Sequence, residues 1–295
     1  MLRNLLRRIR GIWLWLTGGS SLPEDSATKD SSMFNLEGLS PALLPLMQKI
    51  EEEYHRNPPS IAVIGLSGVG KSTTINAMFN TNLTVSATTR GTTKFESIRA
   101  RLDIQRSDAK GNSAYLQVYD APGLGEDIKL DPEYLRMYED VLPKCDVALW
   151  IVAARNRALA LDQMYLKRLE PYLDKIVFAI SQVDLVDPLD WNQHDNLPSD
   201  TQKEHIDKIV RDRSSKLADA FGRPVTCIAY SSTRYYRLMQ LYEHIIANAP
   251  EKRRWLFELV RAFDASDWLK QASGLSDQEK RDIVAKFERE NPALA

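Results

Sequence analysis

One eight-residue segment restricts the possible folds more than any other part of the sequence. Residues 65–72 read GLSGVGKS and fit the pattern G-x-x-x-x-G-K-[ST], between an apolar run at 60–65 and a helical pattern at 71–80. Glycines at these positions let backbone N–H groups turn towards a phosphate, and Lys71 supplies a cation to the β- and γ-phosphates. The hydroxyl of Ser72 is a ligand for Mg²⁺. We expect phosphate contacts from Gly65, Ser67, Gly68, Val69, Gly70, Lys71, Ser72 and Thr73.

The rest of the chain supports an α/β fold around that segment. Short apolar runs alternate with longer amphipathic stretches from residue 60 onwards, which is typical of parallel strands joined by helices. We therefore expect a mostly parallel six-stranded sheet flanked by helices. The expected strands are 60–65, 95–105, 113–120, 146–154, 175–181 and 224–229, and the expected helices are 71–80, 131–143, 158–173, 201–222 and 237–263.

The composition allows a sizeable core and argues against some classes of partner. Of the 295 residues, 43% are apolar and 27% are charged, so a globular core can be buried. The net charge of -1 offers no global basic field for nucleic acid, so any contact with RNA or a membrane has to be local.

Two further stretches supply groups for the phosphates and for a metal ion. The tetrapeptide DAPG closes an expected strand, where Asp120 can hold Mg²⁺ through water and the N–H of Gly123 can sense the γ-phosphate. The stretch TTRGTTK at 88–94 must provide one threonine that reaches Mg²⁺ and the γ-phosphate; we choose Thr93, and the alternatives are Thr92 and Thr89. The predicted metal ligands are Ser72, Thr93 and Asp120, and the predicted catalytic groups are Lys71, Thr93 and Gly123.

A base-reading motif follows a later apolar run. In SQVD at 181–184, the carboxylate of Asp184 can accept hydrogen bonds from guanine N1–H and the 2-amino group, which adenine cannot supply. This favours GTP over ATP. The tetrapeptide AYSS at 229–232 follows the last apolar run, where a backbone N–H can meet guanine O6. The expected base contacts are Ser181, Gln182, Asp184, Ser231 and Ser232.

Taken in order, these motifs resemble those of a known family. GLSGVGKS, GTTK, DAPG, SQVD and AYSS resemble the Era-like branch of small GTPases, often called 50S ribosome-binding GTPases, and within it the bacterial proteins with S-Q-x-D in place of the usual base motif. The resemblance spans about residues 60–247 and implies a six-stranded GTPase fold, binding of Mg²⁺ with GTP or GDP, and a cytoplasmic setting. Association with the ribosome or RNA is implied by the family name alone.

Two residues depart from the usual pattern. Gln182 replaces the lysine whose long stem covers the base, so we expect weaker guanine binding than in orthodox switches. Leu124 stands where many GTPases place a water-orienting glutamine, so intrinsic hydrolysis should be slow without a partner. We expect a molecular switch read by a protein effector or activator; the alternative is a non-hydrolysing GTP-dependent module for assembly or membrane recruitment.

Distinct segments flank the expected GTPase domain. In residues 1–17, apolar side chains gather on one helical face with arginines outside it, which suits a membrane surface, a groove on a partner, or packing on the chain's own domain. Cys145 and Cys227 are typical of reduced core residues in a cytosolic protein. The predicted segments are a basic amphipathic helix at 1–17, a flexible linker at 18–33, a helical lead-in at 34–59, the GTPase domain at 60–247 and a helical extension at 248–295.

Overall fold

A computed structural model of the chain describes residues 54, 56–79, 96–101, 115–127, 129–156, 159–254, 256 and 257. The predictions for the helix at 1–17, the linker at 18–33 and the threonines Thr89, Thr92 and Thr93 lie outside these residues. Among the helices in the described part of the chain, none is both long enough and apolar enough to cross a bilayer.

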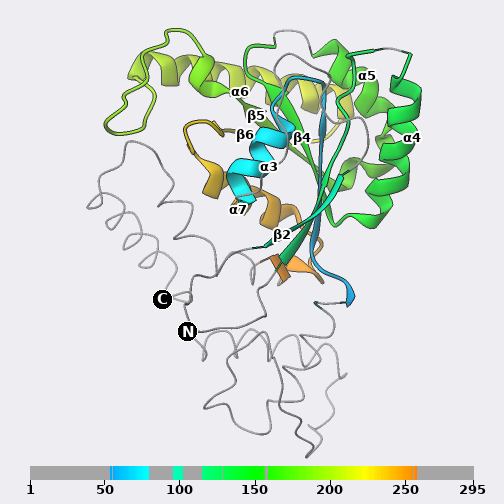
Figure 1. Ribbon diagram of the computed structural model, residues 1–295. Helices are drawn as coiled ribbons and strands as arrows, with labels where there is room; N and C mark the ends of the chain where they lie inside the picture. The colour runs from blue at the N-terminus through cyan, green and yellow to red at the C-terminus, as the bar shows by residue number, and fades with distance from the viewer. Residues whose placement is uncertain are drawn as a thin grey trace, which may run out of the picture.

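Six strands form one sheet in the order β2-β3-β1-β4-β5-β6 (Figure 1). β2 runs antiparallel to β3, and every other neighbouring pair is parallel, which confirms the predicted fold class. The strands are β1 (Ser60–Gly65), β2 (Glu96–Arg101), β3 (Tyr115–Asp120), β4 (Val147–Ala153), β5 (Ile176–Ser181) and β6 (Cys227–Ala229). β6 begins later than expected because Pro224 has no N–H to donate to a neighbouring strand.

Helices cover both faces of the sheet, and every residue of β1 and β5 is buried between them. α3 and α7 lie on one side and α4 and α5 on the other (Figure 1). Phe221 of α6 stacks on Phe178 of β5 with ring centroids 6.2 Å apart, which confirms that this helix lies against the sheet. The helices are α3 (Lys71–Phe79), α4 (Asp131–Val141), η2 (Leu142–Lys144), α5 (Ala160–Arg168), η3 (Glu170–Lys175), η4 (Val183–Leu185), α6 (Asp200–Phe221) and α7 (Leu238–Asn248), where η marks a 3₁₀ helix.

Two predicted helices are shorter than expected. The stretch 158–173 divides into α5 and the 3₁₀ helix η3, in which Pro171 cannot donate a backbone hydrogen bond to the preceding turn. The stretch 237–263 is interrupted after α7, where Ala249 is extended with φ -66° and ψ 147°. Pro250 follows directly, and a proline disfavours the helical conformation in the residue before it.

The register of the strands brings the predicted motifs to one edge of the sheet. Val63 of β1 lies opposite Asp120 of β3, and Ala153 of β4 lies opposite Ser181 of β5. The loops that leave these strands therefore meet at the carboxyl edge, where ligands bind in α/β sheets.

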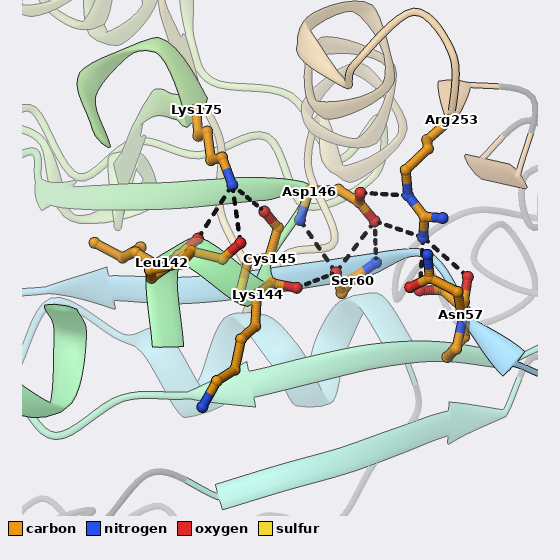
Figure 2. Close-up of polar contacts among 10 residues, drawn as sticks. Asn57, Ser60, Leu142, Lys144, Cys145, Asp146, Lys175 and Arg253 are labelled. Atoms are coloured by element: carbon orange, nitrogen blue, oxygen red, sulfur yellow. Dashed lines mark hydrogen bonds and ion pairs between the residues drawn. The ribbon is translucent and has the colours of Figure 1, made fainter. Parts of the chain in front are cut away.

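A polar cluster closes the opposite, amino edge (Figure 2). Asp146, directly before β4, accepts hydrogen bonds from the backbone N–H of Ser60 at 2.9 Å and from its hydroxyl at 3.1 Å. The guanidinium of Arg253 contacts both carboxylate oxygens, with Nε 2.5 Å from Oδ1 and Nη2 3.1 Å from Oδ2. It also donates to the carbonyls of Asn57 and Pro58. The segment that follows α7 is thereby bonded to the residues just before β1 and β4.

Candidate nucleotide site

The phosphate loop leaves β1 in tight contact with the neighbouring strand. A Cβ at Gly65 would lie 2.6 Å from the carbonyl oxygen of Ile151 in β4, and φ is +140°, so only glycine fits. At the other end of the loop, the carbonyl of Gly70 accepts hydrogen bonds from the N–H of Thr74 at 2.9 Å and from its hydroxyl at 2.7 Å. The first turn of α3 therefore presents its N–H groups to the loop, as an anion site requires.

Lys71 is held inside this loop. Its side chain donates to the carbonyl of Leu66 at 2.9 Å and to that of Gly65 at 3.4 Å, and the residue is 8% exposed. Burial lowers the pKa of the ammonium to about 8, although the negative charges of Asp120 and Glu126 act to raise it. The backbone of the loop thus positions the ammonium of Lys71.

The structure brings two of the three predicted metal ligands together. The hydroxyl of Ser72 donates to Oδ2 of Asp120 at 2.6 Å. A hydroxyl and a carboxylate are hard oxygen donors of the kind that Mg²⁺ prefers, so this pair fits the ion. Thr93, the third predicted ligand, lies outside the described residues.

The segment after β3 is joined to the phosphate loop through its backbone. A Cβ at Gly123 would lie 2.6 Å from Cα of Ser67, so the two backbones touch. The N–H of Ser67 donates to the carbonyl of Leu124 at 2.8 Å, and the N–H of Leu124 donates to the carbonyl of Gly65 at 3.3 Å. A shift of the segment after β3 would therefore alter the backbone contacts of the phosphate loop.

Sequence reasoning missed a tyrosine that supports this junction. The hydroxyl of Tyr138, in α4, donates to the carbonyl of Pro122 at 2.7 Å and lies 3.5 Å from both N and O of Gly65. Its side chain is fully buried, and burial raises the pKa of the phenol well above its usual range, so it remains a donor. The only signal in the sequence is an aromatic residue at core spacing in a helix.

The loop after β5, which is predicted to read the base, holds a carboxylate with one bonded oxygen and one oxygen without a partner among the described residues. Oδ2 of Asp184 accepts a hydrogen bond from the hydroxyl of Thr233 at 3.0 Å, whereas Oδ1 is buried and has no hydrogen-bond partner in the described part of the chain. Gln182 has a left-handed backbone with φ 59°, and its amide donates to the carbonyl of Gly68 at 3.0 Å. The substituted glutamine therefore lies over the phosphate loop, and Thr233, which sequence reasoning missed, orients Asp184.

Buried hydroxyls connect the phosphate side to the base side. Oγ1 of Thr74 lies 2.8 Å from the hydroxyl of Tyr230 and 3.1 Å from that of Ser232. The hydroxyl of Ser181 donates to the carbonyl of Val69 at 2.7 Å. α3 and the loop after β6 are thus cross-linked beneath the site.

Comparison with known proteins agrees with this geometry. A family model described as 50S ribosome-binding GTPase matches residues 60–182. The crystal structure of Aquifex aeolicus Era bound to GDP·AlF4⁻ is 18% identical with a TM-score of 0.50, and the match covers 65% of this chain and 57% of that one. Residues 60–182 therefore match the 50S ribosome-binding GTPase family, as the sequence analysis predicts, and the fold is that of a P-loop GTPase.

The curated proteins that resemble this chain differ in how much of their length is matched. The uncharacterized protein YfjP of Escherichia coli K12 is 32% identical over 167 residues, which are 56% of this chain and 54% of that protein. GTPase Der of Aquifex aeolicus is 29% identical over 126 residues, which are 42% of this chain and 27% of that protein. The chain spans about half the length of the first of these relatives.

The predicted site residues fall into two groups. The residues of the phosphate loop, Asp120 and Gly123 surround the start of α3, and the predicted base contacts line the loops after β5 and β6. Ser231 is fully buried and its hydroxyl accepts from the N–H of Arg234 at 3.1 Å, so its side chain shapes the loop. The roles of these residues in binding nucleotide remain predictions.

Proposed function

We propose that the protein binds GTP with Mg²⁺, hydrolyses it slowly and acts as a molecular switch. The observation that carries this proposal is the direct backbone contact between the phosphate loop and the segment that begins at Gly123. A γ-phosphate that bonds to the N–H of Gly123 has to rearrange this contact, and GDP does not. The segment 121–131 would then differ between the two nucleotide states, and a partner could read the difference.

The residues of the chain supply binding and charge stabilisation. Lys71 and the backbone N–H groups of the phosphate loop bind the β- and γ-phosphates and stabilise the charge that moves to the leaving oxygen. Ser72 and Asp120 would hold Mg²⁺, which supplies Lewis-acid neutralisation of phosphate charge when it is bound. The oxygen Oδ1 of Asp184 would accept from guanine, because a buried carboxylate oxygen without a partner is costly.

The slow rate is proposed because Leu124 is aliphatic and has no group that could orient water. The side chain is 0% exposed and belongs to the apolar core, so it cannot align a water molecule at the γ-phosphate. A partner that adds a charged group could accelerate hydrolysis by roughly 10³ to 10⁵.

The test is a titration of the purified full chain with fluorescent GTP, GDP and ATP in Mg²⁺, followed by phosphate release from wild type and Lys71→Ala. Guanine-selective binding and slow phosphate release that is lost in the variant are expected. Equal binding of ATP would refute the role assigned to Asp184, and a nanomolar dissociation constant for GDP would refute the weak binding expected from Gln182.

A second candidate is a GTP-dependent assembly or membrane-recruitment module that does not hydrolyse. The burial of Leu124 favours it, and multiple-turnover phosphate release by the purified protein would exclude it. A cytoplasmic location, peripheral membrane contact through residues 1–17, a protein effector, and ribosome or RNA association belong to the proposal rather than to the findings. Liposome flotation with and without residues 1–17, and co-sedimentation with ribosomal subunits, test these partners.

A further inference from the structure

Hydrolysis by this domain needs a hydrogen-bond acceptor that Leu124 does not provide. The Leu124 side chain is in the core, and both its N–H and its carbonyl are engaged with the phosphate loop. An acceptor that orients the attacking water therefore has to come from another position near the γ-phosphate.

Glu126 places a carboxylate at the mouth of the phosphate loop. Its Oε2 accepts a hydrogen bond from the hydroxyl of Ser67 at 3.0 Å, and the residue is exposed. Its charge also reaches the buried ammonium of Lys71, where it acts with Asp120 to raise the pKa. The carboxylate thus adjoins both the loop and the cation that are expected to surround the terminal phosphates.

The backbone around Glu126 is anchored on two sides. Gly125 turns the chain with φ +78°, and its N–H donates to Oδ1 of Asp131 at 2.9 Å. Asp131 is buried at the start of α4, and its other oxygen accepts a hydrogen bond from Tyr165. A Cβ at Gly125 would lie 2.9 Å from Cδ2 of Leu161, so the side chain of Leu161 in α5 lies beside the turn. Glu126 is therefore an exposed carboxylate directly after a glycine whose N–H is bonded to the start of α4.

We propose that Glu126 orients the attacking water, an inference that rests on the proposed GTPase activity. The carboxylate accepts a hydrogen bond from a water molecule beside the γ-phosphorus. As the water oxygen bonds to phosphorus, the bond to the β–γ bridging oxygen breaks and its electron pair leaves with GDP. The proton of the water passes through the carboxylate to the released phosphate, which regenerates Glu126. Ser67 is the positioning residue that holds the carboxylate at the loop.

A carboxylate at this place could instead act as a repulsive gate against GTP. The two roles alter different constants. Orientation of water changes the rate of the catalytic step, whereas repulsion of the γ-phosphate changes the dissociation constant of GTP relative to GDP. The comparison of rate with affinity therefore separates them.

The experiment measures single-turnover hydrolysis and the dissociation constants of GTP and GDP for the full chain. Glu126→Ala should lower the hydrolysis rate by about 10²-fold while both dissociation constants stay within about threefold of wild type. Glu126→Gln keeps a hydrogen-bond acceptor but cannot take a proton. Its hydrolysis rate should lie between those of Glu126→Ala and wild type. Glu139→Ala removes a negative charge from an exposed position of α4 and should match wild type.

Two results would overturn the assignment of Glu126. One is unchanged hydrolysis in Glu126→Ala, with or without tighter GTP binding; the other is an equal loss in the Glu139→Ala control. If the wild type binds GTP but releases no phosphate, the proposed GTPase activity is overturned together with the role of Glu126. This failure is separate from a failure of the Glu126 assignment alone, because it is seen in the wild type without any variant. Thermal melts of all variants establish that each remains folded.

Discussion

Replacing Arg253 by alanine should destabilise the GTPase domain without changing its affinity for nucleotide. The ion pair between Arg253 and Asp146 (Figure 2) joins side chains that are 19% and 9% exposed, so it is largely shielded from water. The substitution leaves Asp146 with its two hydrogen bonds from Ser60 but without a cation. The pair lies at the amino edge of the sheet, whereas the nucleotide site lies at the carboxyl edge.

The size of the effect follows from these contacts. Removing one partner of a buried ion pair costs about 3–5 kcal/mol. The lower end applies here, since Ser60 still satisfies the carboxylate of Asp146 and Arg253 is partly exposed, which gives about 3 kcal/mol. In a domain of roughly 200 residues this corresponds to a fall in Tm of about 6–12 °C.

Urea and thermal unfolding of Arg253→Ala, Asp146→Ala and the double variant measure this cost. The double variant should lose less free energy of unfolding than the two single variants added together, because the second substitution removes a charge that the first has left unpaired. Arg254→Ala is the matched control: its guanidinium donates to the carbonyls of Ala247 and Ala249 and has no ion pair with a described residue. A loss below about 1 kcal/mol for Arg253→Ala, a loss equal to that of the control, or a changed GDP affinity would refute the reasoning.

Four further changes test the site. Because the pKa of Lys71 is about 8, the ammonium loses its proton between pH 7 and pH 8.5, and GDP affinity should fall about fourfold over this range. Lys71→Arg should remove this pH dependence. A wild-type affinity that does not change over this range would contradict the prediction. Asp184→Asn should weaken GDP binding and shift preference to xanthosine diphosphate, whose 2-carbonyl accepts from the new amide; unchanged guanine preference would exclude Asp184 as the base reader. Thr233→Ala should weaken GDP binding about tenfold, through loss of a hydrogen bond to a charged group, while Thr233→Ser keeps it; equal effects of the two variants would argue against the bond. Gly123→Ala places a methyl group 2.6 Å from Cα of Ser67, which should separate the phosphate loop from the segment that begins at residue 123. The difference in hydrogen exchange at 121–131 between the complexes with GDP and with a GTP analogue should then disappear. A retained difference would show that the contact is dispensable.

The phosphate side of the site was predictable because its motif fixes residue type and spacing within one short segment. Gly65 has to be glycine where the loop passes β4. Ser72 and Asp120 meet because β1, whose loop leads to Ser72, and β3, which ends at Asp120, have their carboxyl ends at the same edge of the sheet. The break before Pro250 was also readable from local rules, but apolar periodicity on both sides concealed it.

The supporting residues were not predictable, since their roles depend on contacts between distant parts of the chain. Thr233 contacts Asp184 across 49 positions, and Tyr138 contacts Gly65 across 73. Neither belongs to a motif, and a threonine or a tyrosine at such positions is usually part of an ordinary loop or core. Only the sheet order places them beside the site.

The hydroxyls of Thr74, Tyr230 and Ser232 have a consequence for how nucleotide leaves the protein. They join the helix that begins at the phosphate loop to the loop that reads the base, so neither half of the site can loosen alone. We expect a nucleoside that binds without phosphates to order part of the phosphate loop as well, and pyrophosphate to do the same for the loop after β6. We expect both halves of the site to stabilise the complete nucleotide, so that its release requires both halves to open together. An exchange factor for this protein would therefore need to bind only one of the two halves of the site.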